Sequence, residues 1–386
     1  SVADLFGLPH DEKGFTVAEN LLLDTRPGDL VLFVGPSGSG KSSLLRAVAE
    51  QLQATDALTL TLPEVPLVEA LSGTLEERLK QLSACGLAEA RLLLRTPSEL
   101  SDGQRSRFRL AFAFSQTPLR ALFADEFAAN LERPLARVLA YNLRKWVTRT
   151  GCGFLAATTH EDIIADLRPN LLVRCHGEGR IEQTRDESAT LPKPISFAKE
   201  LRLAEGSLAD WPEFAKWHYR SPHLCFVKRV VKLLWGELAL GICVFTTPAA
   251  SLTIRSRYFG LSNPRSRIAL EALNRQMWLL SRVVLQPTYR GAGLGSEFVR
   301  KACEQCPVDW IETLSAMGQA NPVFERAGFI RVGVIQRSEK DTCNGGQFAN
   351  PLAKCSAATL QKSQYSEPVY YVFDNRKTQL LALPTP

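Results

Sequence analysis

The sequence lacks a long apolar run, a secretion signal and a regular cysteine framework. Its longest nearly apolar stretch, residues 238–250, is shorter than the ~18–20 residues that cross a bilayer. No charged-then-apolar segment marks its beginning as a signal peptide. Its nine cysteines are scattered and odd in number, as is typical of a reducing compartment rather than an oxidised scaffold. These absences exclude membrane-spanning and disulfide-stapled classes and predict a soluble, cytoplasmic protein.

The composition is that of a globular protein with an uneven charge. With 386 residues, 45% hydrophobic and 22% charged, the chain is long enough for two or three domains of about 150 residues. Residues 1–190 hold 21 Lys and Arg against 25 Asp and Glu, a net charge of −4, whereas residues 191–386 hold 25 against 15, a net charge of +10. A basic surface attracts polyanions, so the second half is expected to bind nucleic acid or a phosphate-rich cofactor.

A phosphate-binding loop is predicted near the beginning of the chain. Residues 28–34, GDLVLFV, predict a strand, GPSGSGKS follows at 35–42, and residues 43–52 predict a helix. Glycines let the backbone N–H groups converge on phosphates, a lysine adds a cation, and a serine hydroxyl can reach Mg²⁺. The predicted ATP-binding residues are Gly35, Ser37, Gly38, Ser39, Gly40, Lys41, Ser42 and Ser43, and Ser42 is also a magnesium ligand.

A second element, ALFADEF at residues 121–127, predicts an apolar strand that ends in two adjacent carboxylates. Asp125 at the strand end can hold Mg²⁺ through water, and Glu126 is placed to polarise the attacking water. A surface turn would give the same letters. Together with the phosphate loop, however, the pair predicts nucleotide hydrolysis.

Between these elements, LSDGQ at residues 100–104 resembles the LSGGQ signature of ATP-binding-cassette (ABC) ATPases, with Asp102 replacing a glycine. The resemblance implies that Ser101, Gly103 and Gln104 bind ATP held by the phosphate loop of a second subunit. Because the chain carries one cassette, it implies a homodimer. It also implies that His160, which follows a predicted apolar strand, is the family's switch histidine and that Phe15 stacks on adenine, although Phe15 is equally consistent with a core residue.

Three departures separate the chain from transporting members of this family. The stretch from Lys41 to Ser101 is short, and no glutamine occurs between residues 54 and 80, where Glu64 is the candidate substitute. Asn130 stands where the family has an aspartate after the strand-end carboxylates. We therefore expect a soluble ATP-driven switch or clamp rather than a transporter subunit.

The second half begins after a predicted linker at residues 187–194. Residues 280–304 predict a β-branched strand, a glycine-rich turn and an amphipathic helix, a pattern that suits an anion. The turn RGAGLG resembles the pyrophosphate loop of GCN5-related N-acetyltransferases (GNAT). The resemblance implies acetyl-CoA or a related acyl donor, bound by Arg290, Gly291, Ala292, Gly293, Leu294 and Gly295.

A later segment, NPVFERAGF at residues 321–329, resembles the end of the same fold. The family usually carries a tyrosine there that protonates the departing thiolate, and this chain has Phe324. The GNAT-like fold is therefore predicted without the family's ordinary acetyl-transfer acid.

The cluster at residues 212–223, PEFAKWHYRSPH, and the strand VYYVFD at 369–374 resemble the phage DNA-modification proteins of the Mom family, which act on adenine. On that resemblance His218 and Tyr219, with Tyr371 or Asp374, would flank the reacting base as catalytic residues and could ligate a metal ion. The alternative is a half-buried helix face without a catalytic role.

A basic and aromatic stretch follows at residues 253–276. Arginines pair with phosphates and aromatic rings stack on exposed bases, so the stretch predicts a nucleic-acid surface, with a solvated loop as the alternative. The arginines are Arg255, Arg257, Arg265 and Arg267, beside Tyr258 and Phe259.

Four cysteines allow a zinc site only if they converge, and free thiols are the favoured interpretation. They are Cys303 and Cys306, which form a CxxC, and Cys343 and Cys355. The last two lie in a polar insertion at residues 338–366, expected to be a mobile substrate-covering loop or partly disordered.

The sequence thus predicts an α/β P-loop ABC-type ATPase domain over residues 1–190, followed by an α+β GNAT-like domain with a mixed central sheet over residues 195–386. The favoured function is ATP-dependent transfer of a group to a base of DNA or RNA. Two alternatives stay open: acylation of a protein or small-molecule amine under ATPase control, and a non-catalytic ATP-driven DNA clamp.

Overall fold

The computed structural model describes residues 17–116, 120–177, 179–218, 224–261, 266–335 and 367–376. The chain divides into two compact units: unit 1 comprises residues 1–74 and 78–196, and unit 2 comprises 75–77 and 197–386. Each unit has its own central sheet. No helix of the described residues is both long and apolar enough to span a bilayer.

Unit 1 is built on a six-stranded sheet in the order β2-β3-β4-β1-β5-β6. The first five strands in this order pair in parallel, and β6 pairs antiparallel with β5. The strands are β1 (Leu30–Val34), β2 (Thr55–Asp56), β3 (Ala121–Ala124), β4 (Gly153–Thr158), β5 (Leu171–Gly177) and β6 (Arg180–Arg185).

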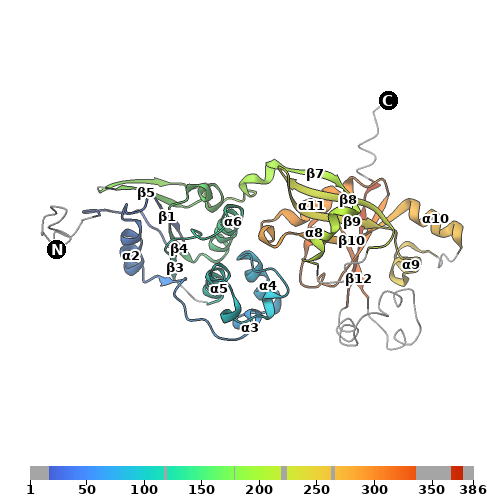
Figure 1. Ribbon diagram of the computed structural model, residues 1–386, viewed down its shortest axis with the longest axis horizontal. Coiled ribbons are helices and arrows are strands. Elements are labelled where there is room, and N and C mark those ends of the chain that lie inside the picture. Colours follow the sequence, from blue (N-terminus) through green and yellow to red (C-terminus); the bar gives the residue numbers. More distant parts are fainter. Residues whose placement is uncertain are drawn as a thin grey trace, which may run out of the picture. The chain divides into compact units, whose positions relative to one another are not determined.

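Helices cover both faces of this sheet, which is why β1 is apolar at every position. Val31 and Phe33 pack in one core cluster with α2 (Lys41–Gln51), whereas Leu30, Leu32 and Val34 pack in another with α5 (Asp102–Ser115) and α6 (Arg133–Thr150). Figure 1 shows α2 and α6 on opposite sides of the strands. The shorter helices are α3 (Leu67–Ala70), α4 (Leu75–Ala84), η1 (Leu92–Leu94), η2 (Pro97–Glu99), η3 (Glu161–Ile163) and α7 (Ile164–Leu167).

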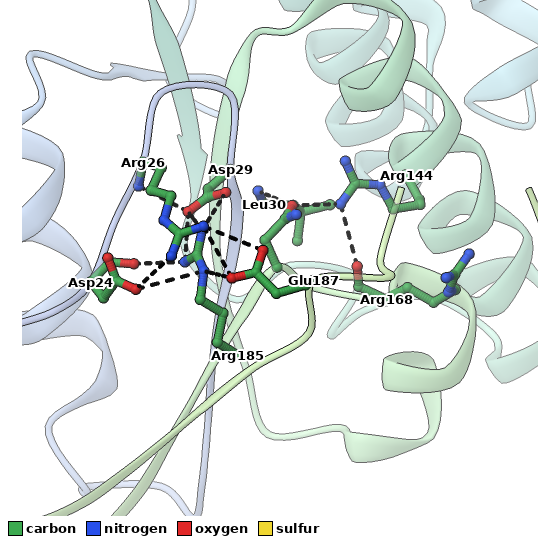
Figure 2. Close-up of polar contacts among 9 residues, drawn as sticks. Asp24, Arg26, Asp29, Leu30, Arg144, Arg168, Arg185 and Glu187 are labelled. Carbon is green, nitrogen blue, oxygen red and sulfur yellow. Dashed lines mark hydrogen bonds and ion pairs between the residues drawn. The ribbon is translucent and has the colours of Figure 1, made fainter. Parts of the chain in front are cut away.

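A polar clasp closes the edge of unit 1 between the segment before β1 and the end of β6. Arg185 donates to both carboxylate oxygens of Asp29, at 3.0 and 3.3 Å from Nη2, and Arg26 donates to Glu187 at 3.0 Å. Figure 2 shows Asp24, Arg26, Arg185 and Glu187 gathered around Asp29. Burial of the Arg144 side chain and the positive charge of Arg168 lower the pKa of the Arg144 guanidinium to about 10.

Unit 2 has a seven-stranded mixed sheet in the order β12-β13-β11-β10-β9-β8-β7. The strands are β7 (Leu201–Gly206), β8 (Val227–Trp235), β9 (Leu238–Thr246), β10 (Met277–Leu285), β11 (Trp310–Ser315), β12 (Ile330–Val334) and β13 (Val369–Asp374). Only β10 and β11 pair in parallel; the other neighbours are antiparallel.

Two helices pack on opposite faces of this sheet. Trp211 and Phe214 of α8 (Trp211–Ala215) pack with Ile242 and Val284, whereas Phe298 of α11 (Leu294–Glu304) lies against the face of Gly241. The connection from β9 to β10 carries α9 (Thr253–Phe259) and α10 (Arg267–Gln276) (Figure 1). The remaining short helices are η4 (Ser196–Glu200), η5 (Leu208–Asp210), η6 (Pro287–Tyr289) and α12 (Val323–Arg326).

The predicted linker is an ordered part of unit 1. Arg168 donates to the carbonyl oxygens of Ser188, at 2.6 Å, and Leu191, and Ala189 is fully buried. Unit 1 ends at Ser196, so residues 186–196 form a strap bound to its surface. The Pro-containing composition suggested a free linker because composition does not reveal the side chains that bind its carbonyl groups.

Candidate nucleotide site and unit 2 site

The predicted strand, loop and helix of the phosphate site are all present, as β1, residues 35–40 and α2. Gly38 and Gly40 adopt φ of +78° and +88°, which turns successive N–H groups toward one side of the loop. A Cβ at Gly35 would lie 2.0 Å from the carbonyl oxygen of Cys175, so no side chain fits there. Ser39 is 6% exposed and its hydroxyl oxygen is buried without a hydrogen-bond partner. The loop therefore fits a phosphate.

The cationic part of the site is Lys41, which is only 8% exposed at the start of α2. Its ammonium donates to the Pro36 carbonyl at 2.6 Å and so lies within the curve of the loop. A buried ammonium in that place keeps two donor positions for phosphate oxygens. The helix dipole of α2 adds positive potential at the same end.

The predicted magnesium ligands lie together at the ends of neighbouring elements. Ser42 donates its hydroxyl proton to Asp125 at 2.9 Å, although 83 residues separate them. Asp125 also accepts from its neighbour's backbone N–H at 3.0 Å and from Arg46 at 3.3 Å. A hydroxyl and a carboxylate side by side form the oxygen-rich set that Mg²⁺ prefers.

Glu126 and His160 follow the ends of adjacent strands β3 and β4. Glu126 is exposed and adopts φ of +52°, a left-handed conformation that is uncommon for a residue with a side chain. His160 is half-buried, and its backbone N–H bonds the Thr158 hydroxyl at 3.2 Å. Both residues therefore lie at the same edge of the sheet as the phosphate loop.

The LSDGQ segment begins α5. Ser101 and Gln104 form a capping box: the Gln104 N–H donates to the Ser101 hydroxyl, and the Ser101 N–H donates to the Gln104 side chain at 3.1 Å. A Cβ at Gly103 would meet nothing within 4 Å. Asp102, which replaces the glycine, is fully exposed and pairs with Arg105 at 3.2 Å.

Glu64, the candidate substitute for the missing glutamine, is hydrogen-bonded to Ser98. Its carboxylate accepts the Ser98 N–H at 3.2 Å and the Ser98 hydroxyl. The hydrogen bond from the Ser98 side chain is the main reason that the pKa of Glu64 lies below its usual range. Glu64 thus ties the segment after β2 to η2, just ahead of the LSDGQ segment.

The chain was compared with known proteins. A family model described as "ABC transporter" matches residues 18–60. The lipoprotein-releasing system ATP-binding protein LolD of Novosphingobium aromaticivorans is 32% identical over 207 residues, which cover 43% of this chain and 90% of that protein. The aliphatic sulfonates import ATP-binding protein SsuB 2 of Rhodococcus jostii is 34% identical over 205 residues, covering 47% of this chain and 82% of that protein.

The chain belongs to the ABC family of ATP-binding proteins. Membership of this family is evidence that unit 1 hydrolyses ATP, and Mg²⁺ is expected to bind together with ATP. A solved dimeric ATP-binding cassette bound to ADP and Pi aligns with 46% of this chain and 95% of that chain, at 19% identity and a TM-score of 0.34. These three matches each cover less than half of the chain.

In unit 2 the predicted glycine-rich turn follows β10 after the short helix η6. Gly291 and Gly293 adopt φ of +84° and +82°, and α11 begins at the next residue, Leu294. The Arg290 guanidinium donates to the Leu285 carbonyl at 2.9 Å and to the Trp217 carbonyl at 3.5 Å. These bonds tie the start of the turn to the end of β10.

The strands on either side of this turn diverge. β10 pairs with β11 over only three residue pairs, Met277 to Leu279 with Trp310 to Glu312, although both strands continue beyond them. Thr313 marks the fork by donating its hydroxyl to the Leu280 carbonyl at 2.9 Å. β11 therefore leaves β10 unpaired from Leu280, where the two strands diverge, to Leu285 at its end, ahead of the glycine turn.

The proposed base-flanking residues are not brought together. Arg290 donates to the carbonyl oxygens of Leu285 and Trp217, so His218, the residue after Trp217, lies near the Leu285 end of β10. Asp374 is the strand partner of Trp310, which in turn pairs with Met277 at the other end of β10. Strand ends eight residues apart are separated by about 26 Å. No group of three His, Cys, Asp or Glu side chains that could hold a metal occurs among the described residues. The prediction of a shared metal site is therefore wrong for His218 and Asp374, and Tyr219 lies outside the described residues.

Tyr371 is likewise not a surface residue beside a base. It is completely buried, and its hydroxyl bonds the Glu325 carboxylate at 2.8 Å and the Gly318 carbonyl at 3.0 Å. Burial raises its pKa. Its ring packs 5.4 Å from Phe324, the residue at the family's tyrosine position, so both contribute to the core.

The predicted nucleic-acid arginines divide into two kinds. Arg257 and Arg267 are exposed on α9 and α10, and Arg265 lies outside the described residues. Arg255, however, is 1% exposed and donates to Glu312 at 3.0 Å, so its assignment to a binding surface is wrong. The helix turns this side chain toward the sheet, whereas the residue two positions later faces solvent.

Sequence reasoning missed the partners of Arg255. Glu312 is 1% exposed and also accepts the Tyr370 hydroxyl at 2.8 Å. Burial raises the pKa of Glu312, and the positive charge of Arg255 opposes that rise. The sequence did carry one sign of this pair, because Glu312 lies inside the apolar strand WIETLS. If that strand is central in the sheet, the glutamate is buried and needs a buried partner.

The cysteines of unit 2 are free thiols where they are described. Cys303 and Cys306 are buried, and burial raises the pKa of Cys306 to about 12. Cys343 and Cys355, the insertion 338–366 and Phe15 lie outside the described residues.

Proposed function

We propose that this chain is an ATP-dependent nucleic-acid-modifying transferase in which an ABC ATPase dimer drives a GNAT-like unit that acts on a base of DNA or RNA. The proposal rests on one observation: a single chain carries two sites, one in each unit. Unit 1 holds Lys41, Ser42 and Asp125 in a nucleotide arrangement, and unit 2 places a glycine turn beside a forked pair of strands.

In the ATPase half, the loop at residues 35–43 would hold the phosphates, Ser42 and Asp125 would hold Mg²⁺, and Glu126 would orient the attacking water. His160 follows the adjacent strand and would contact the same phosphates. The exposed Ser101 and the half-buried Gly103 and Gln104 would close over ATP bound to a second copy. The open space around Gly103 supports this role because a phosphate could approach its backbone.

In the transferase half, the turn from Arg290 to Gly295 would receive the diphosphate of acetyl-CoA or a related donor. The amide groups at the start of α11 support this assignment. A linear donor would extend from the turn along the part of β10 that β11 leaves unpaired. Because Phe324 replaces the family's acid, another group must receive or supply the proton, and His218 is our candidate.

The nucleic-acid part of the proposal is supported by the net charge of +10 over residues 191–386, by the exposed Arg257 and Tyr258 of α9, and by the exposed Arg267 of α10. Tyr258 is 40% exposed, enough to stack on an unpaired base. A base inside a duplex must be flipped out at a cost of a few kcal/mol, to which closure of the ATPase dimer could contribute.

The deciding experiment compares the wild-type chain with Glu126→Gln and His218→Ala. We expect ATP hydrolysis to rise with DNA and fall steeply with salt, and nucleosides from expressing cells to contain an altered base by mass spectrometry. Glu126→Gln should accumulate an ATP-bound dimer, and His218→Ala should remove the altered base but leave solubility unchanged.

Each alternative has its own result in the same experiment. DNA binding without any altered base would replace the transferase by an ATP-driven clamp. Acetyl transfer to a protein or small-molecule amine without nucleic acid would replace the base by an amine acceptor. If DNA neither binds nor affects hydrolysis, the nucleic-acid proposal is wrong.

A further inference from the structure

The segment after β4 begins at the nucleotide edge of unit 1. β4 pairs in parallel with β1, and its last residue, Thr158, is opposite Val34, which directly precedes the phosphate loop. Residues 159–167, which contain His160, η3 and α7, therefore start at the same edge of the sheet as the phosphate loop. A movement of that edge would therefore displace this segment directly.

Two ion pairs join this segment to α6. Arg133 donates from Nε to Asp162 at 3.0 Å, and Arg137 donates from Nε to Asp166 at 3.2 Å. α6 itself follows residues 125–132, which start at the proposed magnesium ligand Asp125. Both segments that leave the nucleotide edge thus meet at Asp162 and Asp166.

Asp166 connects this junction to the end of the unit. The Ser196 N–H donates to one carboxylate oxygen of Asp166 at 2.7 Å, and the Ser196 hydroxyl donates to the other at 2.6 Å. Arg137 donates to the same hydroxyl oxygen at 2.5 Å. Asp166 is only 2% exposed, whereas Ser196 is the last residue of unit 1.

The chain on both sides of Ser196 is firmly held. Ile195 is 1% exposed and Phe197 is completely buried, with its ring stacked 4.3 Å from Trp235 in unit 2. Before it, Arg168 binds two carbonyl groups of the strap at residues 186–196. The strap is therefore tied to α7 and to Arg168 at several points, so a displacement of α7 would shift the strap as well.

We propose that Asp166 is a positioning residue that transmits the nucleotide state of the ABC ATPase site to the strap and to the start of unit 2. A buried carboxylate that loses its partners is strongly unfavourable, so Ser196 and Arg137 must follow Asp166 when residues 159–167 move. The strap then has two positions, one for each nucleotide state. This goes beyond the proposed function, because it holds whatever reaction unit 2 performs.

The test is hydrogen exchange of the full chain, measured by mass spectrometry with and without saturating Mg·AMP-PNP, an ATP analogue that is not hydrolysed. Saturation is established by a binding titration for every variant. In the wild type we expect nucleotide to change exchange in residues 186–200 by about fivefold or more. Ser196→Ala, which alters an exposed side chain and removes two hydrogen bonds, should reduce that change to less than about twofold without altering nucleotide affinity.

Asp166→Asn is the second variant, because it keeps the size of the side chain but removes the charge that binds Arg137. The matched control is Asp186→Asn in the same strap, whose carboxylate accepts from the N–H and hydroxyl of Ser188, also in the strap, and it should retain the wild-type response. The proposal is overturned if nucleotide alters exchange in residues 159–167 but not in 186–200, or if Ser196→Ala responds as the wild type does. Neither result depends on the reaction of unit 2.

Discussion

Replacement of Arg255 tests the buried ion pair of unit 2 most directly. Arg255→Met removes a guanidinium that bonds Glu312 at 3.0 Å and the Ala249 carbonyl at 2.6 Å, and leaves Glu312 as a buried charge without its cation. Breaking a buried pair in this way costs about 3–5 kcal/mol. We therefore expect the free energy of unfolding of unit 2 to fall by that amount at pH 8.

The loss should depend on pH with a defined sign. Burial already raises the pKa of Glu312, and removing Arg255 removes the charge that opposes that rise. Because the folded-state pKa then lies further above the unfolded value, the variant is most stable at low pH and loses stability as pH rises through the folded pKa. Each unit of additional shift corresponds to about 1.4 kcal/mol. The deficit should therefore be smaller at pH 5 than at pH 8.

Urea unfolding followed by tryptophan fluorescence is the assay. Five of the six tryptophans lie in unit 2, so the signal reports mainly on that unit. Arg257→Met is the matched control, because this arginine is exposed two residues later and should change stability by less than about 0.5 kcal/mol. The double variant Arg255→Met/Glu312→Gln should recover part of the loss. The reasoning is refuted if Arg255→Met costs no more than Arg257→Met, or if its cost is the same at both pH values.

Three further outcomes are expected. Gly35→Ala should abolish binding of a fluorescent ATP analogue while far-UV circular dichroism stays normal, because its Cβ would lie 2.0 Å from the Cys175 carbonyl oxygen; affinity within twofold of the wild type would contradict this. A hydrogen bond from Lys232 is the main cause that lowers the pKa of Asp210, so Asp210 contributes stability above its unfolded pKa of about 3.8 that is lost as pH falls through the lower folded value. Asp210→Asn should therefore cost about 0.5–1 kcal/mol at pH 7 and nothing at pH 2, measured by urea unfolding, and a pH-independent difference would count against the pair. Iodoacetamide at pH 8 should label exposed Cys225 before buried Cys303, by peptide mass mapping, and equal rates would be inconsistent with the burial of Cys303.

The nucleotide site was largely predictable from the sequence because its parts are local. A strand, a loop of fixed length and a helix follow one another within residues 28–52, and their order alone places Lys41 and Ser42 at the helix start. Asp125 was predicted from a strand-end carboxylate. In a parallel sheet that position is near the loop in any register that buries both strands.

Unit 2 was less predictable because its important contacts join distant residues. The strand before the glycine turn, the turn itself, the helix after it and the strand at 369–374 were predicted, but the divergence of β10 from β11 depends on pairing across the sheet. His218 and Asp374 were grouped on the resemblance to Mom-family proteins, and the strand order separates them. Arg255 was grouped with its exposed neighbours, since a short helix of seven residues gives no clear apolar stripe.

Residue types at short, fixed spacings identify the ABC ATPase family and the phosphate loop, and composition alone gives the unequal charge of the two halves. Which charges face solvent and which are buried depends on the tertiary fold. Arg255 meets Glu312 across 57 residues and Asp166 meets Ser196 across 30. Pairings at such separations depend on how strands and helices pack, and residue spacing does not encode that packing.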